Sequence, residues 1–447
     1  MKAGGNAIQP PGWPDDLLGP VCSLPEYTRL WVAFSGGLDS ALLLQVAAAC
    51  HPDVTALHVN HQLQPNHEQT EQFCRDECAR LGVQLVVERV DVALANTGAG
   101  GLEGAARSAR YQAFKNRLGD NDLILMAHHG DDQAETVLFR LLRGTGVHGL
   151  AGMPGTRPLG RGWLFRPWLE VSRERLEQMA RASGMAWVED PSNTSLAFDR
   201  NYLRHSVLPG LKSRWPGLLK RMARTARACG ESEWLNQRLA ELQWRSCADA
   251  GRLKLEPFQG LSGAEQTNLM RWWIHRQGWR VPALSDWDKA LQSMLNAGED
   301  RVPEIRGEGF SLRRYRAHLY LVPNLGVPDS TADLVPGRIL QWGPWRLQLV
   351  PKLSAANPKI TPPPIRVSTR QGGERLRLAA AEPSRALKTW LQEQGVPPWE
   401  RALLPLVYRH GQGISELIAV GDLWCSEQYS GSAPAAGWRL IVERDCD

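Results

Sequence analysis

The chain has 447 residues, which at about 100–200 residues per domain gives two to four domains that each bury a core. Hydrophobic residues make up 43% of the chain and charged residues 22%, which excludes a disulfide miniprotein, a collagen-like chain and a disordered protein. The net charge is +5: residues 1–210 hold 19 basic and 23 acidic side chains, whereas residues 211–447 hold 33 and 24.

The chain lacks the sequence marks of a membrane or secreted protein. The longest uncharged apolar stretch near its start, 41–50, is about half of the ~20 residues that a membrane span needs. The first thirty residues contain no apolar run of the kind found in secretory signals, so a cytoplasmic protein without membrane association is expected. The eight cysteines form no CxxC motif, which favours reduced and mostly buried thiols over a disulfide framework or a zinc site.

The first 145 residues alternate between β-rich runs and helical periods, the pattern of a parallel sheet with crossover helices. The expected strands are 30–34, 54–60, 83–90 and 123–128. The expected helices are 40–50, 68–81, 103–117, 131–143 and 172–184, with a mobile glycine-rich loop at 96–101. The fold class is therefore α/β, a doubly wound parallel sheet. This first domain is expected to span 1–210, because Pro209 and Gly210 break the pattern.

The second half changes character after residue 210. Residues 211–322 are expected to form a mainly helical domain, although 310–322 alternates like a pair of strands. Nine prolines from 323 to 364 indicate a linker around a short strand-like stretch at 346–350, and 365–447 is typical of a small α+β domain. The basic excess of this half makes a nucleic-acid partner plausible, but arginine-rich composition and ordinary solvated faces explain the excess equally well.

The loop after the first expected strand has the composition of a phosphate site. Its residues are Ser35, Gly36, Gly37, Leu38, Asp39 and Ser40. Two glycines let the backbone approach an anion closely, and the start of the following helix adds a partial positive charge. No lysine follows, so the GxxxxGK[ST] loop of P-loop ATPases is not matched, and Asp39 indicates a magnesium ligand. The simpler alternative is a turn with a helix cap.

A histidine and carboxylate cluster, HHGDDQAE at 128–135, follows the fourth expected strand. Ligands of open parallel sheets bind beyond the carboxyl ends of the strands, so this cluster is expected to face the same crevice as the loop at 35–40. Asp132 and Glu135 are three residues apart on a helix, which allows a metal or a protonated amine to bind between them. A metal-dependent phosphoesterase site and plain helix caps remain alternatives for this cluster alone.

Six segments taken in order resemble the tRNA(Ile)-lysidine synthase family of the N-type ATP pyrophosphatase (PP-loop) superfamily. They are SGGLDS at 35–40, ALHVNHQL at 56–63, EGAARSARY at 103–111, AHHGDDQAETVLFRLLRGTGVHGLAGM at 127–153, RPWLEVSR at 166–173 and EDPSNTSLAFDRNYLR at 189–204. The resemblance returns with RALKTWLQEQGVPPWERALLPLV at 385–407 and covers essentially the whole chain. One departure is Gln64, which stands where many members carry an arginine and receives no role.

The resemblance implies that ATP and Mg²⁺ are used to join free L-lysine to the 2-position of the wobble cytidine of an isoleucine tRNA with a CAU anticodon. The cytidine is first adenylated with release of pyrophosphate, and lysine then displaces AMP to give lysidine. In this scheme residues 35–40 bind ATP and Asp39 helps to hold Mg²⁺. Asp132 positions or deprotonates the lysine amine, Glu135 orients it, and Arg107 or Arg110 stabilises the adenylate phosphate.

The second half is then expected to hold the tRNA by phosphate and shape contacts. The residues expected to contact tRNA are Arg204, Arg375, Lys388 and Arg401, with Arg313, Arg314 and Arg316 around Tyr315 as further candidates. For any of these arginines an ordinary surface salt bridge is the simpler alternative. A homodimer is compatible with the sequence.

Two other functions compete with this one. A tRNA thiolase of the same superfamily is the nearest alternative within the enzymes, but the catalytic cysteine pair typical of many thiolases is absent near the crevice. A silent tRNA-binding or nucleotide-sensing protein is the alternative outside the enzymes, and the intact motifs at 35–40 and 128–136 argue against it.

Overall fold

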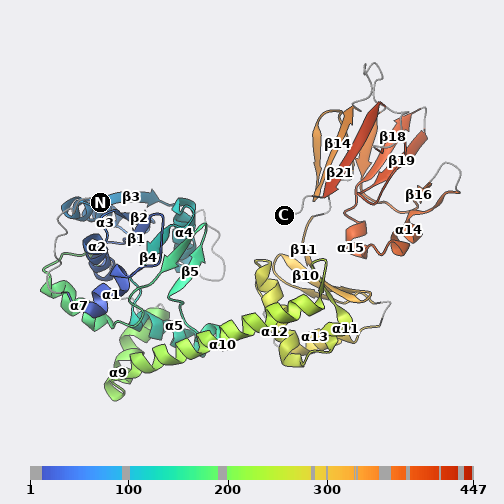
Figure 1. Ribbon diagram of the computed structural model, residues 1–447. Helices are drawn as coiled ribbons and strands as arrows, with labels where there is room; N and C mark the ends of the chain where they lie inside the picture. The colour runs from blue at the N-terminus through green and yellow to red at the C-terminus, as the bar shows by residue number, and fades with distance from the viewer. Residues whose placement is uncertain are drawn as a thin grey trace, which may run out of the picture. The chain divides into compact units, whose positions relative to one another are not determined.

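The computed structural model describes residues 13–92, 101–189, 199–282, 287–298, 301–326, 328, 331–351, 364–378, 383–411, 414–430 and 437–444. Most of the glycine-rich loop expected at 96–101, and the stretch 190–198, lie outside these residues. The chain divides into two compact units, Met1–Arg238 and Leu239–Asp447. In Figure 1 the first unit is coloured from blue to green and the second from yellow to red. Among the described helices none is both long and apolar enough to cross a membrane.

The first unit is built on a six-stranded sheet with the strand order β3-β2-β1-β4-β6-β5. Its strands are β1 Leu30–Ala33, β2 Val54–Asn60, β3 Gln84–Arg89, β4 Leu123–Leu125, β5 Thr156–Leu159 and β6 Gly162–Phe165. Every neighbouring pair is parallel except β5 with β6. The predicted α/β class with a parallel sheet is confirmed, and β1 lies between β2 and β4.

Helices cover both faces of this sheet (Figure 1). The helical segments that begin in the first unit are α1 Asp15–Cys22, α2 Leu38–Cys50, α3 His67–Leu81, α4 Gly101–Arg117, α5 Gly130–Leu142, α6 Val147–Leu150, α7 Arg173–Ala182, α8 Asp199–Tyr202, the π-helical turn η2 Leu203–Val207, α9 Leu208–Arg214 and α10 Leu218–Cys247. Because side chains alternate along a strand, Leu30 and Val32 join the core around α2, whereas Trp31 packs with Phe114 of α4 on the other face.

The second unit begins with an antiparallel sheet that the sequence only partly predicted. Its order is β7-β8-β11-β10-β9, with β7 Ala248–Asp249, β8 Arg252–Lys254, β9 Glu304–Arg306, β10 Phe310–Tyr315 and β11 His318–Pro323. The strand pair expected at 310–322 is confirmed as β10 and β11. Three helices pack with it: α11 Leu255–Gln259, α12 Gly263–Arg276 and α13 Trp287–Leu295. Helix α12 starts at a capping box in which Ser262 and Glu265 bond each other's backbone amides.

Residues 323–364 contain more strand than the expected proline-rich linker, because their described part supplies three strands to the C-terminal sheets, one of which includes the strand-like stretch expected at 346–350. These are β12 Thr331–Asp333, β13 Ile339–Trp342 and β14 Trp345–Pro351. Trp345, Leu347 and Leu349 are buried at alternate positions of β14, which pairs along its full length with β21, Trp438–Arg444. The alternation lies between prolines, and Pro351 is accommodated at the end of the strand.

The rest of the C-terminal part is α+β, as expected. Two antiparallel sheets have the orders β12-β15-β18-β19-β20 and β13-β14-β21, and a short pair joins β16 to β17. The remaining elements are β15 Ile365–Ser368, β16 Arg375–Leu376, β17 Arg385–Ala386, α14 Leu387–Glu393, α15 Pro398–Arg401, β18 Leu406–Gly411, β19 Ile414–Val420 and β20 Trp424–Cys425.

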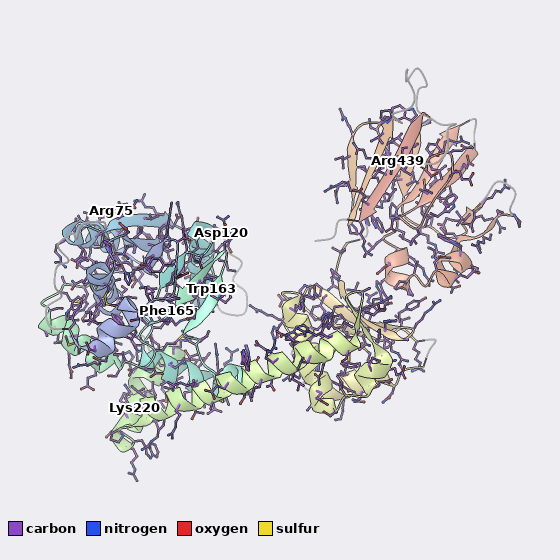
Figure 2. The ribbon with its side chains drawn as sticks, viewed as in Figure 1. Arg75, Asp120, Trp163, Phe165, Lys220 and Arg439 are labelled. Atoms are coloured by element: carbon purple, nitrogen blue, oxygen red, sulfur yellow. A yellow bond between two sulfur atoms is a disulfide. The ribbon has the colours of Figure 1, made fainter. Side chains whose placement is uncertain are left out.

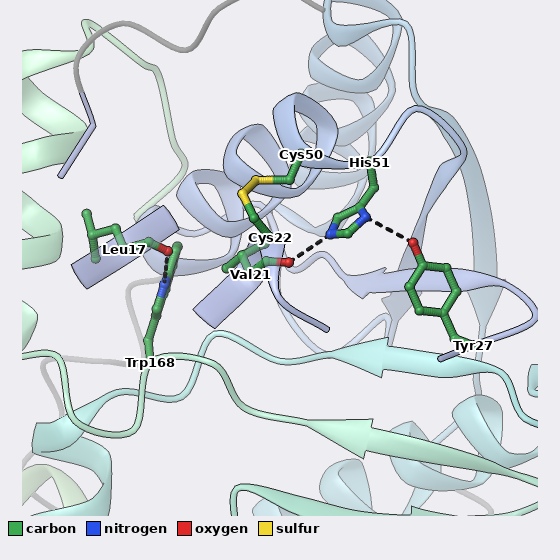
Figure 3. Close-up of a disulfide and its surroundings, with 7 residues drawn as sticks. All are labelled: Leu17, Val21, Cys22, Tyr27, Cys50, His51 and Trp168. Carbon is green, nitrogen blue, oxygen red and sulfur yellow. Dashed lines mark hydrogen bonds between the residues drawn. A yellow bond between two sulfur atoms is a disulfide. The ribbon is translucent and has the colours of Figure 1, made fainter. Parts of the chain in front are cut away.

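The expectation that all cysteines are reduced is wrong for Cys22 and Cys50, which form a disulfide (Figure 3). The bond joins the end of α1 to the end of α2, two helices that pack together although these cysteines are 28 residues apart. Beside it, His51 Nε2 donates to Val21 O at 2.7 Å and Nδ1 accepts from Tyr27 Oη at 2.9 Å. Trp168 Nε1 donates to Leu17 O, so α1 is fixed at several points. The other cysteines within the described ranges are free.

Reduction of this disulfide should destabilise the first unit, because the cross-link restricts the unfolded chain. For a sequence separation of 28 residues we expect dithiothreitol to lower the free energy of unfolding by about 3 kcal/mol, measured by urea denaturation. The double variant Cys22→Ser with Cys50→Ser should no longer respond to dithiothreitol, whereas Cys229→Ser should respond like the wild type. Equal wild-type stability with and without reductant would show that the bond does not form in solution.

Candidate active site

The loop at 35–40 folds back on itself between β1 and α2. Gly36 has φ +84°, and a Cβ there would lie 3.2 Å from both Cys74 Sγ and Thr70 Cγ2, so only glycine fits. Ser40 Oγ accepts from Ser35 N at 3.2 Å and donates to Gly37 O at 3.0 Å. No side chain caps the start of α2, so its first backbone amides remain available to an anion.

Asp39, in the first turn of α2, faces the end of β4. Its Oδ2 lies 3.7 Å from His129 Nε2, and its Oδ1 is buried without a hydrogen-bond partner among the described residues. Burial, together with the nearby charge of Asp132, raises the pKa of Asp39 above its ordinary value. An unpartnered buried carboxylate oxygen suits a divalent cation. The described residues hold no group of three or more metal-ligating side chains, so Mg²⁺ would share Asp39 with phosphate oxygens and water.

His129 connects the loop to the carboxylates of α5. It forms the N-cap of α5: Nδ1 accepts from Asp132 N at 3.3 Å, and His129 N donates to Asp132 Oδ2 at 3.0 Å. Because Nδ1 accepts, a ring hydrogen lies on Nε2, which is 3.4 Å from Asp132 Oδ2 and faces Asp39. The capping box thereby holds the two predicted site carboxylates, Asp39 and Asp132, around one imidazole.

Arg204 occupies a place in this cluster that the sequence did not predict. From the π-helical turn η2, its Nε donates to Glu135 Oε1 at 2.6 Å, and its Nη2 donates to Glu135 Oε2 at 2.9 Å and to Asp132 Oδ1 at 2.8 Å. The guanidinium expected to contact tRNA thus bonds both of the predicted catalytic carboxylates. The sequence gives little indication of this role for Arg204, because nothing in the segment DRNYLR predicts that it packs against α5.

The pKa values of Asp132 and Glu135 are shifted in opposite directions. Burial opposes ionisation of Asp132, but His129 and Arg204 together hold its pKa below the ordinary value. Burial raises the pKa of Glu135 despite its bonds to Arg204, and the charge of Asp132 adds to the effect. One carboxylate is therefore kept ionised while its neighbour is a better proton acceptor, an arrangement typical of acid–base sites. Asp131 is occupied elsewhere, by Arg173 N and Lys212.

Arg107 and Arg110 both lie on α4, on the same side of the sheet as Tyr111. The Arg107 guanidinium lies 5.1 Å from the centroid of the Tyr111 ring and donates to its hydroxyl at 3.4 Å. Arg110 Nε donates to His61 Nε2 at 3.3 Å, at the end of β2. Their roles at the adenylate phosphate remain predictions.

Arg166 and His128 were not given roles by sequence reasoning. Arg166 follows β6, is 4% exposed, and donates from Nε to His128 Nδ1 at 3.1 Å and from Nη1 to Pro154 O at 2.7 Å. Burial lowers the pKa of His128 to about 3, so its ring is neutral. The usable signal was position, because Arg166 directly follows β6 and His128 comes three residues after the end of β4.

A cavity of about 1270 Å³ adjoins the cluster. Gln133 and Arg166 form part of its wall, and Phe165 at the end of β6, labelled in Figure 2, lines it as well. Trp234 of α10 also lines the cavity and is 60% exposed. Arg140 is fixed there by donating to Gly149 O and Gly152 O. The cavity combines an exposed aromatic ring with guanidinium groups, the side chains on which unstacked bases are held.

The other residues expected to contact tRNA have different surroundings. Arg375 and Lys388 are exposed, although Arg375 Nε donates to Ser384 Oγ at 3.0 Å. Arg401 is 8% exposed and donates to Val396 O at 2.8 Å and to Tyr315 Oη at 3.2 Å, and this burial argues against the expected tRNA contact. Arg314 is likewise bonded internally, to carbonyls at the end of α13.

Comparison with known proteins agrees with this geometry. A PP-loop domain model matches residues 17–211, a TilS substrate binding domain model matches 253–320, and a TilS substrate C-terminal domain model matches 365–442. A tRNA(Ile)-lysidine synthase of Pseudomonas aeruginosa is 41% identical over 428 residues, with 92% of each chain covered. This chain belongs to the tRNA(Ile)-lysidine synthase family. Other members are 38% identical in Alkalilimnicola ehrlichii, covering 96% of this chain and 97% of that one, and 34% identical in Coxiella burnetii, covering 96% of both.

Membership of the tRNA(Ile)-lysidine synthase family confirms the resemblance stated from the motifs and the expectation of a PP-loop enzyme. The PP-loop match contains residues 35–40 and Asp132, Glu135 and Arg204, so the whole cluster lies in the nucleotide-binding part of the family. It supports ATP as the nucleotide. The substrate binding domain match contains β9, β10 and most of β8, and the C-terminal domain match contains β15 to β20 and most of β21.

The neutral state of His128 predicts a pH dependence of stability. Above pH 6.5 neither the folded nor the unfolded chain protonates this ring, whereas below it only the unfolded chain does, so stability falls as the pH drops from 6.5 toward 3. His128→Asn keeps an acceptor for Arg166 but does not titrate. Between pH 6.5 and 5, we expect the free energy of unfolding of the wild type to fall more steeply than that of His128→Asn, by about 1 kcal/mol per pH unit. Parallel profiles for variant and wild type, measured by urea denaturation, would contradict this.

Proposed function

We propose that the protein joins free L-lysine to the 2-position of the wobble cytidine of a CAU-anticodon isoleucine tRNA through an adenylated cytidine. The observation that supports this most is the convergence of Asp39, His129, Asp132 and Glu135 where β1 and β4 end. It puts a phosphate-binding loop beside a pair of carboxylates that suits an amine. Relatives that match 92% and 96% of this chain carry the name tRNA(Ile)-lysidine synthase. These substrates place the reaction in the cytoplasm.

In the first step the loop at 35–40 and the start of α2 hold the β- and γ-phosphates of ATP, so that pyrophosphate is the leaving group. The 2-carbonyl oxygen of the cytidine attacks the α-phosphorus, an oxygen–phosphorus bond forms, and the bond to pyrophosphate breaks. Asp39 would hold Mg²⁺, which neutralises charge on the phosphates when bound. The cavity beside Gln133 and Arg166 gives an unstacked base room to reach this point.

In the second step the ε-amine of lysine attacks carbon 2 of the cytidine, the new carbon–nitrogen bond forms, and AMP leaves with the former carbonyl oxygen. Asp132, which is kept ionised, binds the incoming ammonium group. Glu135, whose pKa is raised by burial, is the better acceptor for the proton that the amine must lose. Arg204 already bonds both carboxylates, so it holds them in place and lowers the charge of the empty site.

The reaction is tested with ATP, radiolabelled lysine and either CAU-anticodon isoleucine tRNA or initiator methionine tRNA. We expect label only in the isoleucine tRNA. Glu135→Gln should slow lysine-dependent AMP release by about 100-fold or more while adenylation, followed with α-labelled ATP, changes much less. Asp132→Asn should behave similarly, and Asp120→Asn, an exposed residue labelled in Figure 2, is the matched control. Label in neither RNA, or ADP as the product, would refute the proposal.

We propose in addition that Arg375 and Lys388 contact tRNA phosphates. Charge reversal by Arg375→Glu or Lys388→Glu should weaken tRNA binding several-fold and reduce the salt slope of binding by about one per residue. ATP binding should remain unchanged, because neither residue belongs to the nucleotide-binding part. Arg439→Glu, on the surface of β21 (Figure 2), makes the same change of charge on another sheet. An equal loss in that variant would mean that general charge, and not these two positions, is responsible.

A further inference from the structure

His61 has an unusual hydrogen-bonding state at the end of β2. Its Nε2 lies 3.3 Å from Arg110 Nε, and a guanidinium can only donate, so Nε2 must accept. Burial, followed by the charge of Arg110, lowers the pKa of His61 to about 4, which keeps the ring neutral at physiological pH. The ring's one hydrogen therefore lies on Nδ1.

The Nδ1 hydrogen of His61 has no acceptor among the described residues, and Nδ1 is shielded from solvent. His58, on the same strand, bonds Phe34 O through Nδ1 at 2.9 Å, and His51 uses both of its nitrogens. Buried donors are nearly always paired in folded proteins, so a donor that is unpaired among the described residues points to a ligand group as its partner. The His61 ring as a whole is partly exposed, which leaves it accessible from the crevice.

The position of His61 in the sheet limits what that ligand can be. β1 lies between β2 and β4, with the phosphate loop at its carboxyl end. The carboxylates that would act on cytidine and lysine follow β4, so the acceptor base and the amine take up that side of the loop. The α-phosphate also carries the nucleoside, which must then extend in the other direction, over the end of β2. His61 is the residue that follows β2 there.

We infer that His61 donates a hydrogen bond from Nδ1 to an acceptor atom on the nucleoside part of ATP, either an adenine nitrogen or a ribose oxygen. Arg110 is then a positioning residue, because its bond to Nε2 fixes the hydrogen on Nδ1. This changes the expectation that Arg110 stabilises the adenylate phosphate. The inference rests on the proposed function, since it takes ATP to be the nucleotide at the loop.

Two isosteric substitutions separate the two nitrogens of the ring. In His61→Asn the amide nitrogen takes the place of Nδ1 as a donor, and nothing remains at Nε2. In His61→Gln the amide oxygen reaches the place of Nε2 and accepts from Arg110, and no donor remains at Nδ1. ATP binding to the full-length chain, measured by calorimetry without tRNA or lysine, should be about tenfold weaker in His61→Gln and His61→Ala and within about threefold of wild type in His61→Asn.

The opposite order, with glutamine retaining affinity and asparagine losing it, would overturn the inference, as would unchanged affinity in all three variants. His410→Asn, in the second unit, makes the same substitution away from the sheet of the first unit and should bind ATP like the wild type. Thermal unfolding of each variant checks that the fold is intact. A variant that fails to fold is replaced by Arg110→Gln, for which we expect weakened ATP binding because the hydrogen is no longer fixed on Nδ1.

Nucleotide analogues identify the acceptor. The 2′-deoxy and 3′-deoxy forms of ATP remove ribose oxygens, and the 1-, 3- and 7-deaza forms remove adenine nitrogens. The analogue that lacks the contacted atom should bind the wild type and His61→Ala with equal affinity, whereas ATP should bind the wild type about tenfold more tightly than His61→Ala. If every analogue still distinguishes the two proteins, the inference is wrong. If the protein forms lysidine but substitutions of His61 do not change ATP binding, only this inference is wrong. If the His61 variants change ATP binding as expected but no lysidine forms, only the proposed function is wrong.

Discussion

His129 can lie between the carboxylates of Asp39 and Asp132 only because β1 and β4 pair in parallel. The pairing places Leu30 opposite Leu123 and Val32 opposite Leu125, so both strands end at the same edge of the sheet. The chain continues from one strand into a glycine turn and from the other into the N-cap of α5. Two helix starts and two carboxylates therefore meet in one small volume, which favours anions and cations at neighbouring points.

Basic and acidic side chains alternate in this volume. The immediate neighbours of each carboxylate therefore decide whether its pKa is lowered or raised. Asp132 is held ionised by His129 and Arg204, whereas for Glu135, one helical turn away, burial outweighs the bonds to Arg204 and raises the pKa. Arg204 bonds both, so neither carboxylate is left buried and unpaired before substrates bind. Arg166 is likewise paired within the protein, because it donates hydrogen bonds to His128 and to the carbonyl of Pro154.

Much of the first unit was predictable from sequence, because its signals are local. The apolar strands, the glycine turn at 35–40 and the polar residues directly after 123–128 all follow from short-range pattern, and parallel topology then puts them at one edge. The bonds of Arg204 to α5, the disulfide between α1 and α2 and the pairing of β14 with β21 join segments far apart in the chain. No local pattern specifies such contacts: the strand-like stretch at 346–350 was visible between prolines, but the burial of Trp345, Leu347 and Leu349 in a sheet with the much later strand β21 was not.

Arg204 leaves its helix from a π-helical turn, which accommodates one more residue than an α-helical turn of the same height. The turn lies between α8 and α9, so the three form one continuous helical segment. Loss of one residue there would restore α-geometry and rotate the guanidinium by about 100° away from the carboxylates, whatever side chains remained. Selection should therefore act on the length of this segment as strictly as on the identity of its arginine, and insertions or deletions within 199–214 should be rarer among relatives than substitutions.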